Sequence, residues 1–150
     1  MKKKGKSKRV RLPSLKRLQA RADRLWSKMI LRDGQKYDFQ NDSFPTMCQV
    51  CHSRNATTGH HVFHKGANGR VRYDRRNGLP ICTGCHLRER FNPTPVVCAA
   101  IGYHGIAKFL ELAGDVESFP GRYVWTRERL NMVLIALETI LEVPDAGADK

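Results

Sequence analysis

Four of the five cysteines in this 150-residue chain form two C-x-x-C pairs separated by 30 residues. Two such pairs at this spacing are typical of a closed, tetrahedral site for a structural Zn²⁺ ion. A redox-active C-x-x-C is disfavoured because neither pair follows a predicted strand and opens a helix. We therefore expect zinc bound by Cys48, Cys51, Cys82 and Cys85, with Cys98 left over as a small buried hydrophobic residue.

Residues able to catalyse a reaction lie between the two cysteine pairs and directly after the second pair. A neutral imidazole can act as a general base near pH 7 or bind a divalent ion. Adjacent residues on a strand point to opposite faces, so two consecutive histidines would take different roles. The residues concerned are His60, His61, His64, Asn77 and His86.

The charge balance predicts a polyanionic partner. Lys and Arg number 27 against 14 Asp and Glu, which gives a net charge of +13, and the pI is about 10.0. Nucleic acid is the commonest partner of such a protein. An acidic membrane surface is disfavoured because the sequence has no amphipathic basic-aromatic helix, although the charge could also serve only solubility. The candidate contacts to the DNA backbone are Arg70, Arg72, Arg75, Arg76, Arg88 and Arg90.

The compartment is expected to be the cytoplasm, with no membrane partner. No apolar run approaches the roughly 20 residues of a membrane span. The opening MKKKGKSKRVRLP is basic but no apolar segment follows it, so it does not resemble a secretory signal. A reducing compartment would keep the thiols free for metal.

The periodicity of apolar residues and the positions of glycine and proline divide the chain into five segments. Apolar residues at steps of three and four predict a basic amphipathic helix after Pro13. Helices are also expected in the C-terminal part, with breaks near Gly102 and Gly105 and a final helix capped by Thr126. The expected segments are a basic tail over 1–13, the basic helix over 14–34, a zinc-bound core over 46–92, a helical part over 93–143 and a tail over 144–150.

The segment 48–91 resembles the HNH nuclease motif. The paired histidine precedes two apolar residues, Asn77 stands five residues before a C-x-x-C, and His86 follows that pair directly. The resemblance implies the ββα-metal fold, in which a hairpin and a helix hold one divalent ion. The expected fold class is therefore α+β, with a zinc-bound ββα-metal core flanked by the N-terminal basic helix and the C-terminal helices.

The resemblance also implies a role for each signature residue. His61 would be the general base, with His60 as an alternative base, and Asn77 would orient the backbone or ring of His61. His60 and His86 would bind the catalytic ion, Mg²⁺ or Mn²⁺, and His86 thereby belongs to the catalytic set. His64 could bind the same ion or a phosphate. Arg88 and Arg90, beyond His86, would contact phosphate oxygens.

A looser resemblance extends over residues 14–113, to the phage NinG/Rap recombination endonucleases. It rests on the basic helix from Leu15 to Lys28, a Gly-His pair and Arg-Tyr-Asp-x-x-Asn before the second cysteine pair. It implies branched DNA such as four-way junctions as substrate, and a bacterial or phage-infected cytoplasm. Two departures bring the site closer to general HNH enzymes: His86 where that family has Asn, and a paired instead of a single histidine.

The expected function is metal-dependent endonucleolytic cleavage of DNA. The alternative is a zinc-ribbon module that binds nucleic acid and cuts nothing, which would explain the charge and the cysteines but not the histidine spacing. A third hypothesis is that the protein is an assembly factor that retains a nuclease core for contacts with partners. The final apolar helix could pair two copies into a homodimer, or pack on its own domain.

Overall fold

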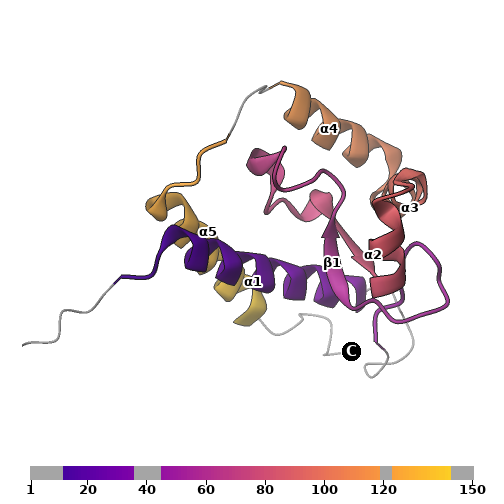
Figure 1. Cartoon of the computed structure of the whole chain (residues 1–150), viewed down its shortest axis with the longest axis horizontal. Coiled ribbons are helices and arrows are strands. Elements are labelled where there is room, and N and C mark those ends of the chain that lie inside the picture. Colours follow the sequence, from indigo (N-terminus) through magenta and orange to yellow (C-terminus); the bar gives the residue numbers. More distant parts are fainter. Residues whose placement is uncertain (1–11, 36–44, 119–122, 143–150) are drawn as a thin grey trace, which may run out of the picture.

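A computed structural model describes residues 12–35, 45–118 and 123–142. The tail expected over 144–150, and most of the one expected over 1–13, lie outside the described residues. The described chain has a mixed α+β fold, in agreement with the expected class (Figure 1). Its elements are α1 (Leu15–Gln35), β1 (Thr58–His61), the 3₁₀ helices η1 (Gly69–Val71) and η2 (Arg75–Asn77), β2 (Gly78–Ile81), α2 (Thr83–Glu89), α3 (Thr94–His104), α4 (Ile106–Glu117) and α5 (Arg127–Glu142).

Helix α1 coincides with the basic helix expected over 14–34, and it forms the larger core with α5. The two helices lie side by side at one edge of the molecule (Figure 1). Apolar residues three or four positions apart place one stripe of α1 against α5, where it is removed from water. The buried members of this core are Leu18, Ala22, Trp26, Met29, Ile30, Leu130, Leu134 and Leu137.

Strands β1 and β2 form a two-stranded antiparallel sheet that packs directly on α1. In its register His60 pairs with Leu79 and His61 pairs with Gly78. A Cβ atom on Gly78 would lie 2.2 Å from Ile30 Cδ1, so a side chain at this position would push the sheet away from α1. The backbone N–H of Gly59 donates a hydrogen bond of 2.8 Å to Ser27 Oγ on α1.

A second core lies on the other side of the sheet and includes cysteines of both C-x-x-C pairs. Every residue of β2 is buried, because α1 covers the sheet on one side and α3 packs against β2 on the other. This core has too few apolar side chains to be large, which is typical of a segment that a metal ion helps to stabilise. Its buried residues are Cys48, Leu79, Ile81, Cys82, Cys85, Val96 and Ala100.

The C-terminal part contains the expected break, but at one glycine instead of two. Gly105 separates α3 from α4 and has a φ of 84°, a left-handed conformation that favours glycine. Gly102 lies inside α3. The imidazole Nε2 of His104 lies 2.7 Å from the carbonyl oxygen of Gly78, so His104 attaches the end of α3 to β2. Thr126 caps α5 as expected, since its Oγ1 accepts a hydrogen bond from the Arg129 N–H.

Two further findings concern the C-terminal helices. Cys98 is exposed, so its expected role as a buried hydrophobic residue is wrong: it lies on the outward side of α3, whereas Val96 and Ala100 point into the core. No single helix among the described residues is long and apolar enough to cross a membrane. Helices α3 and α4 pass that test only as a pair, bent by 118°.

Candidate functional site

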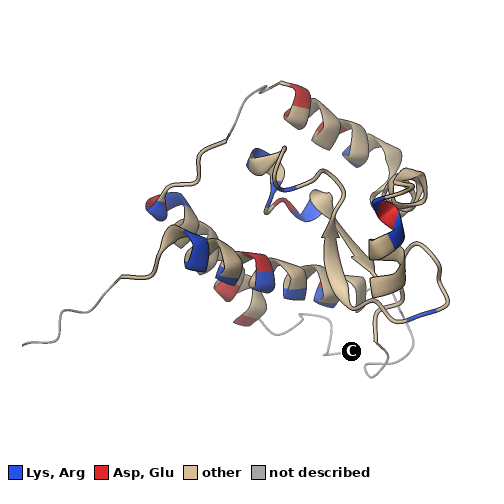
Figure 2. Ribbon diagram, in the orientation of Figure 1, with Lys and Arg blue, Asp and Glu red and all other residues tan. Residues whose placement is uncertain are grey.

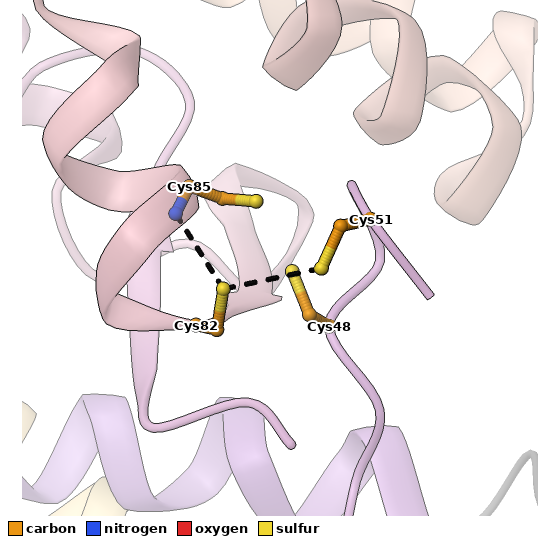
Figure 3. Close-up of side chains that lie close together, drawn as sticks. All are labelled: Cys48, Cys51, Cys82 and Cys85. Carbon is orange, nitrogen blue, oxygen red and sulfur yellow. Dashed lines mark hydrogen bonds between the residues drawn. The ribbon is translucent and has the colours of Figure 1, made fainter. Parts of the chain in front are cut away.

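The four cysteines of the two C-x-x-C pairs come together into one cluster. Their Sγ atoms all lie within 4.8 Å of one another, and Cys51 Sγ is 4.0 Å from Cys82 Sγ (Figure 3). Four sulfur ligands at about 2.3 Å from a tetrahedral Zn²⁺ are separated by about 3.8 Å, so the cluster fits this ion after small adjustments. None of the four forms a disulfide. The cluster can therefore hold a metal ion such as zinc, as the spacing predicted.

Local backbone structure presents the cysteines to the ion. An isolated bridge joins Met47 to Asn55 and closes a tight turn around the first pair. In the second pair Cys82 is the N-cap of α2, and its Sγ accepts a hydrogen bond from the backbone N–H of Cys85. Hydrogen bonds from Ser53 lower the pKa of Cys51 to about 6, whereas burial raises the pKa of Cys85 to about 12. A low pKa favours the thiolate, which is the form that binds zinc.

A pocket of about 640 Å³ lies between α1, β1 and α2, and it brings all four histidines predicted from the sequence together. His60 and His61 come from β1, His64 from the loop after it, and His86 from α2. Four basic side chains line the same pocket, together with Glu89: Arg24 and Lys28 of α1, Lys65 and Arg90. The site therefore combines imidazoles with positive charge at its rim.

His60 has a buried ring nitrogen, Nε2, that could bind a metal ion. The residue is 4% exposed, and its Nε2 has no hydrogen-bond partner. Its ring centroid lies 4.9 Å from that of His86 and 6.2 Å from that of His64. Burial, followed by the neighbouring charges of His86, His64 and His61, lowers the pKa of His60 to about 3. The ring is therefore neutral at pH 7, with a lone pair available to a metal ion.

His61 lies in a different environment although it is the next residue. Its ring stacks on the indole of Trp26, with centroids 3.9 Å apart and planes inclined by 14°. A hydrogen bond joins the ring to the backbone of Arg72, while the buried Nε2 has no partner. Burial is the main cause that lowers its pKa to about 4, against the opposing effect of Asp23. A neutral, oriented ring with a free Nε2 can accept a proton, and the lowered pKa makes it a weaker base than an ordinary imidazole.

Glu89 is a pocket residue that the sequence analysis did not single out. It is only 7% exposed, and its Oε1 lies 3.1 Å from Nε2 of His64. The signal in the sequence was the His-x-x-Glu spacing of His86 and Glu89, which places both on one face of a helix. Among the described residues, the cysteine cluster is the one group of three or more whose ligand atoms all lie within 4.8 Å. The histidines and Glu89 line one pocket, but their ligand atoms are more widely spaced than the sulfur atoms of the cysteine cluster.

Asn77 stabilises the loop between the strands. It is fully buried, and its Oδ1 accepts a hydrogen bond of 2.7 Å from the Phe63 N–H. Its Nδ2 donates to the carbonyl oxygens of Phe63 and Val71, at 3.0 and 3.1 Å. These side-chain contacts begin two residues beyond His61, and the Asn77 carbonyl oxygen accepts a hydrogen bond of 2.9 Å from the Val62 N–H. Of the two expected roles, the contacts thus involve the backbone that follows His61 and not its ring. Asn77 fixes the end of β1 against the loop.

Three of the six arginines expected on DNA are engaged in ion pairs between elements. Arg72 donates two hydrogen bonds to Asp23 of α1, at 2.9 and 2.7 Å. Arg75 pairs with Asp33, which also lies on α1. Arg76 pairs with Asp74 and with Asp115 of α4. These side chains therefore connect the loop between the strands to α1 and α4.

The remaining expected arginines are exposed. Arg70 lies in η1, while Arg88 and Arg90 lie at the end of α2, and Arg90 alone of the three lines the pocket. Lys and Arg residues, coloured blue in Figure 2, also lie along α1. The sequence analysis assigned α1 a basic side, but only the fold shows that Arg24 and Lys28 reach the histidine pocket.

Comparison of the chain with protein-family models, with curated proteins and with solved structures found no match. Any assignment of function therefore depends on the residues and geometry of the site.

Proposed function

We propose that this chain is a metal-dependent endonuclease of the HNH type that hydrolyses phosphodiester bonds in DNA. The observation that carries the proposal is the contrast between His60 and His61 within one pocket. His60 has a buried, unpartnered Nε2, and its ring lies 4.9 Å from that of His86. His61 is held by Trp26 and by the Arg72 backbone with its own Nε2 free. The site can thus bind an ion and hold a base at the same time.

In the proposed reaction, His61 Nε2 takes a proton from a water molecule whose oxygen attacks the scissile phosphorus. The bond from phosphorus to the 3′ oxygen breaks, and that oxygen takes a proton from solvent. The products carry a 5′-phosphate and a 3′-hydroxyl. His60 and His86 would hold Mg²⁺ or Mn²⁺, which supplies charge neutralisation at the phosphate and at the departing oxygen. Their donor atoms fit a divalent ion because His60 Nε2 is buried without a partner.

The proposed substrate is DNA, with branched forms such as four-way junctions as first choice. The net charge of +13 supports a polyanionic substrate. So do the cations at the pocket rim, among them Arg24, Lys28 and Arg90. The preference for branched DNA comes from the resemblance to recombination endonucleases. Two copies could cut a symmetric junction, and Met132 and Ile135, exposed on α5, offer an apolar surface for such pairing.

The test is cleavage of a labelled four-way junction beside a linear duplex of matched sequence. Zinc-loaded protein would be assayed with Mg²⁺, with Mn²⁺ and after chelation, and zinc content would be measured in each sample. We expect metal-dependent cleavage that His61→Ala reduces by about 10²–10⁴-fold while DNA affinity and zinc content are kept. His52→Ala, at an exposed histidine outside the pocket, is the matched control.

Tight binding of both DNAs without cutting, under every ion, would refute the proposal and favour the zinc-ribbon binding module. Cleavage that His61→Ala leaves unchanged, with loss in His60→Ala, would reverse the assignment of base and ligand. Equal cutting of junction and duplex would retain the nuclease but remove the preference for branched DNA.

A further inference from the structure

Glu89 is a carboxylate buried in the histidine pocket. Burying a charged group is costly unless it is paired or bound to a metal ion. Its Oε1 lies 3.1 Å from Nε2 of His64, whose side chain is 66% exposed, so this partner is largely in water. Such a partner compensates a buried carboxylate poorly. The residue therefore has a capacity for binding positive charge that the protein itself does not fully use.

Glu89 shares its surroundings with three imidazoles. His86 and Glu89 lie one turn apart on α2, and residues three apart on a helix face the same side. His60 approaches from β1, with its ring 4.9 Å from that of His86 and 6.2 Å from that of His64. His60 Nε2 is buried and lacks a partner. Four potential ligands, from β1, the loop after it and α2, thus surround one volume.

We propose that His64 and Glu89 join His60 and His86 as ligands of the catalytic ion, which makes the site selective for a transition metal over Mg²⁺. The inference rests on the proposed function in that it concerns the same pocket. The side chains of His64 and His86 are exposed and can rotate towards His60 Nε2 without disturbing a core. A bound ion would replace His64 as the main partner of Glu89.

The chemistry of the donors determines the selectivity. Imidazole nitrogens suit Zn²⁺, Ni²⁺, Fe²⁺ and Co²⁺, and Mn²⁺ accepts a mixture of nitrogen and carboxylate ligands. Mg²⁺ prefers oxygen ligands and keeps several waters, so a set of three imidazoles and one carboxylate is poor for it. The site is therefore expected to bind Mn²⁺, or a divalent ion of a later first-row transition metal, in preference to Mg²⁺.

The test uses the full-length protein without DNA, carrying one Zn²⁺ per chain at the four cysteines. Binding of Mn²⁺ is measured from the loss of the electron paramagnetic resonance signal of free Mn²⁺. We expect one Mn²⁺ per chain, displaced by Mg²⁺ only at a concentration at least tenfold higher. Glu89→Gln keeps the volume and can still accept a hydrogen bond from His64, but it removes the charge. It should weaken Mn²⁺ binding about 10–100-fold. Glu117→Gln, at an exposed glutamate of α4, is the matched control and should bind like wild type.

His64→Ala is the second variant and covers the case in which Glu89→Gln does not fold, because His64 is exposed. It should also weaken Mn²⁺ binding by at least tenfold, with melting temperature and zinc content unchanged. Wild-type affinity for Mn²⁺ in both folded variants would overturn the inference, even if the protein cleaves DNA. So would equal affinity of the wild type for Mg²⁺. Binding that depends on Glu89 and His64, without any cleavage, would support the ligand set and refute the nuclease proposal.

Discussion

The indole of Trp26 stacks on the imidazole of His61 with ring centroids 3.9 Å apart. Trp26 belongs to α1 and is fully buried in the core that this helix forms with α5. The proposed base is thus fixed by the largest side chain of the main core. Helix α1 is therefore part of the site as well as its support.

Replacing Trp26 should affect stability and cleavage in a graded way. Trp26→Leu removes the flat surface beneath His61 and leaves a cavity, at a cost of about 2–4 kcal/mol in the free energy of unfolding. Trp26→Phe retains an aromatic face and should lose less stability and less cleavage activity than Trp26→Leu. Denaturant unfolding and single-turnover cleavage, at a temperature where both variants are folded, measure the two effects. Full cleavage by folded Trp26→Leu would show that the stacking does not orient His61.

The four clustered cysteines and the exposed Cys98 should respond differently to substitution. Cys82→Ser removes a buried ligand from the four-sulfur cluster and should abolish zinc binding and unfold the segment around the hairpin. Cys98→Ser alters an exposed thiol on α3 and should retain zinc and melting temperature. Zinc content by mass spectrometry and thermal melting provide the measurements. A stable Cys82→Ser variant with one zinc per chain would be inconsistent with the four-cysteine site.

Asp23 should stabilise the fold in a manner that depends on pH. Burial raises its pKa, but the hydrogen bonds and charges of Arg72 and Lys65 outweigh this effect and hold the pKa below the usual 3.8. A lowered pKa in the folded state contributes stability that is present above pH 4 and lost as the pH falls through the folded value. Asp23→Asn should cost about 1–3 kcal/mol near pH 7.

The measurement is urea unfolding of wild type and Asp23→Asn between pH 3 and pH 7. The difference in the free energy of unfolding should shrink below pH 4. The buried histidines also destabilise the fold in acid, and this effect should be larger in Asp23→Asn because Asp23 raises the pKa of His61. The comparison therefore depends on the change within the range below pH 4. A difference that stays constant down to pH 3 would mean that the Asp23 carboxylate is not the cause.

The cations at the pocket rim should contribute to DNA affinity through phosphate contacts. The double variant Arg24→Ala/Lys28→Ala should reduce the slope of log affinity against log salt by about 0.9 for each lost contact, or roughly two in total. Lys108→Ala/Arg129→Ala removes two charges from α4 and α5, away from this pocket, and is the matched control. Fluorescence anisotropy with labelled DNA over a salt series gives both slopes. Equal slopes for the two double variants would argue against DNA running over α1.

The sequence by itself determined the parts that depend on spacing along the chain. Two C-x-x-C pairs predicted the four-cysteine cluster, because the geometry of zinc ligands restricts such spacings. Apolar residues at helical steps predicted α1 and α5, because the side-chain period of a helix is a local property. The alternation of neighbouring strand residues indicated that His60 and His61 would occupy different environments.

Tertiary structure alone decided which environment each histidine occupies and which arginines are already paired. Trp26 lies 35 residues before His61, and Arg72 lies 49 residues after Asp23. No local pattern encodes such pairs, because they arise only when the hairpin packs on α1 through Gly59 and Gly78. The same packing brings Arg24 and Lys28 to the pocket, and the pairing of β1 with β2 sets His60 beside His86. The residue types were therefore visible in the sequence, whereas their partners depended on contacts between distant segments.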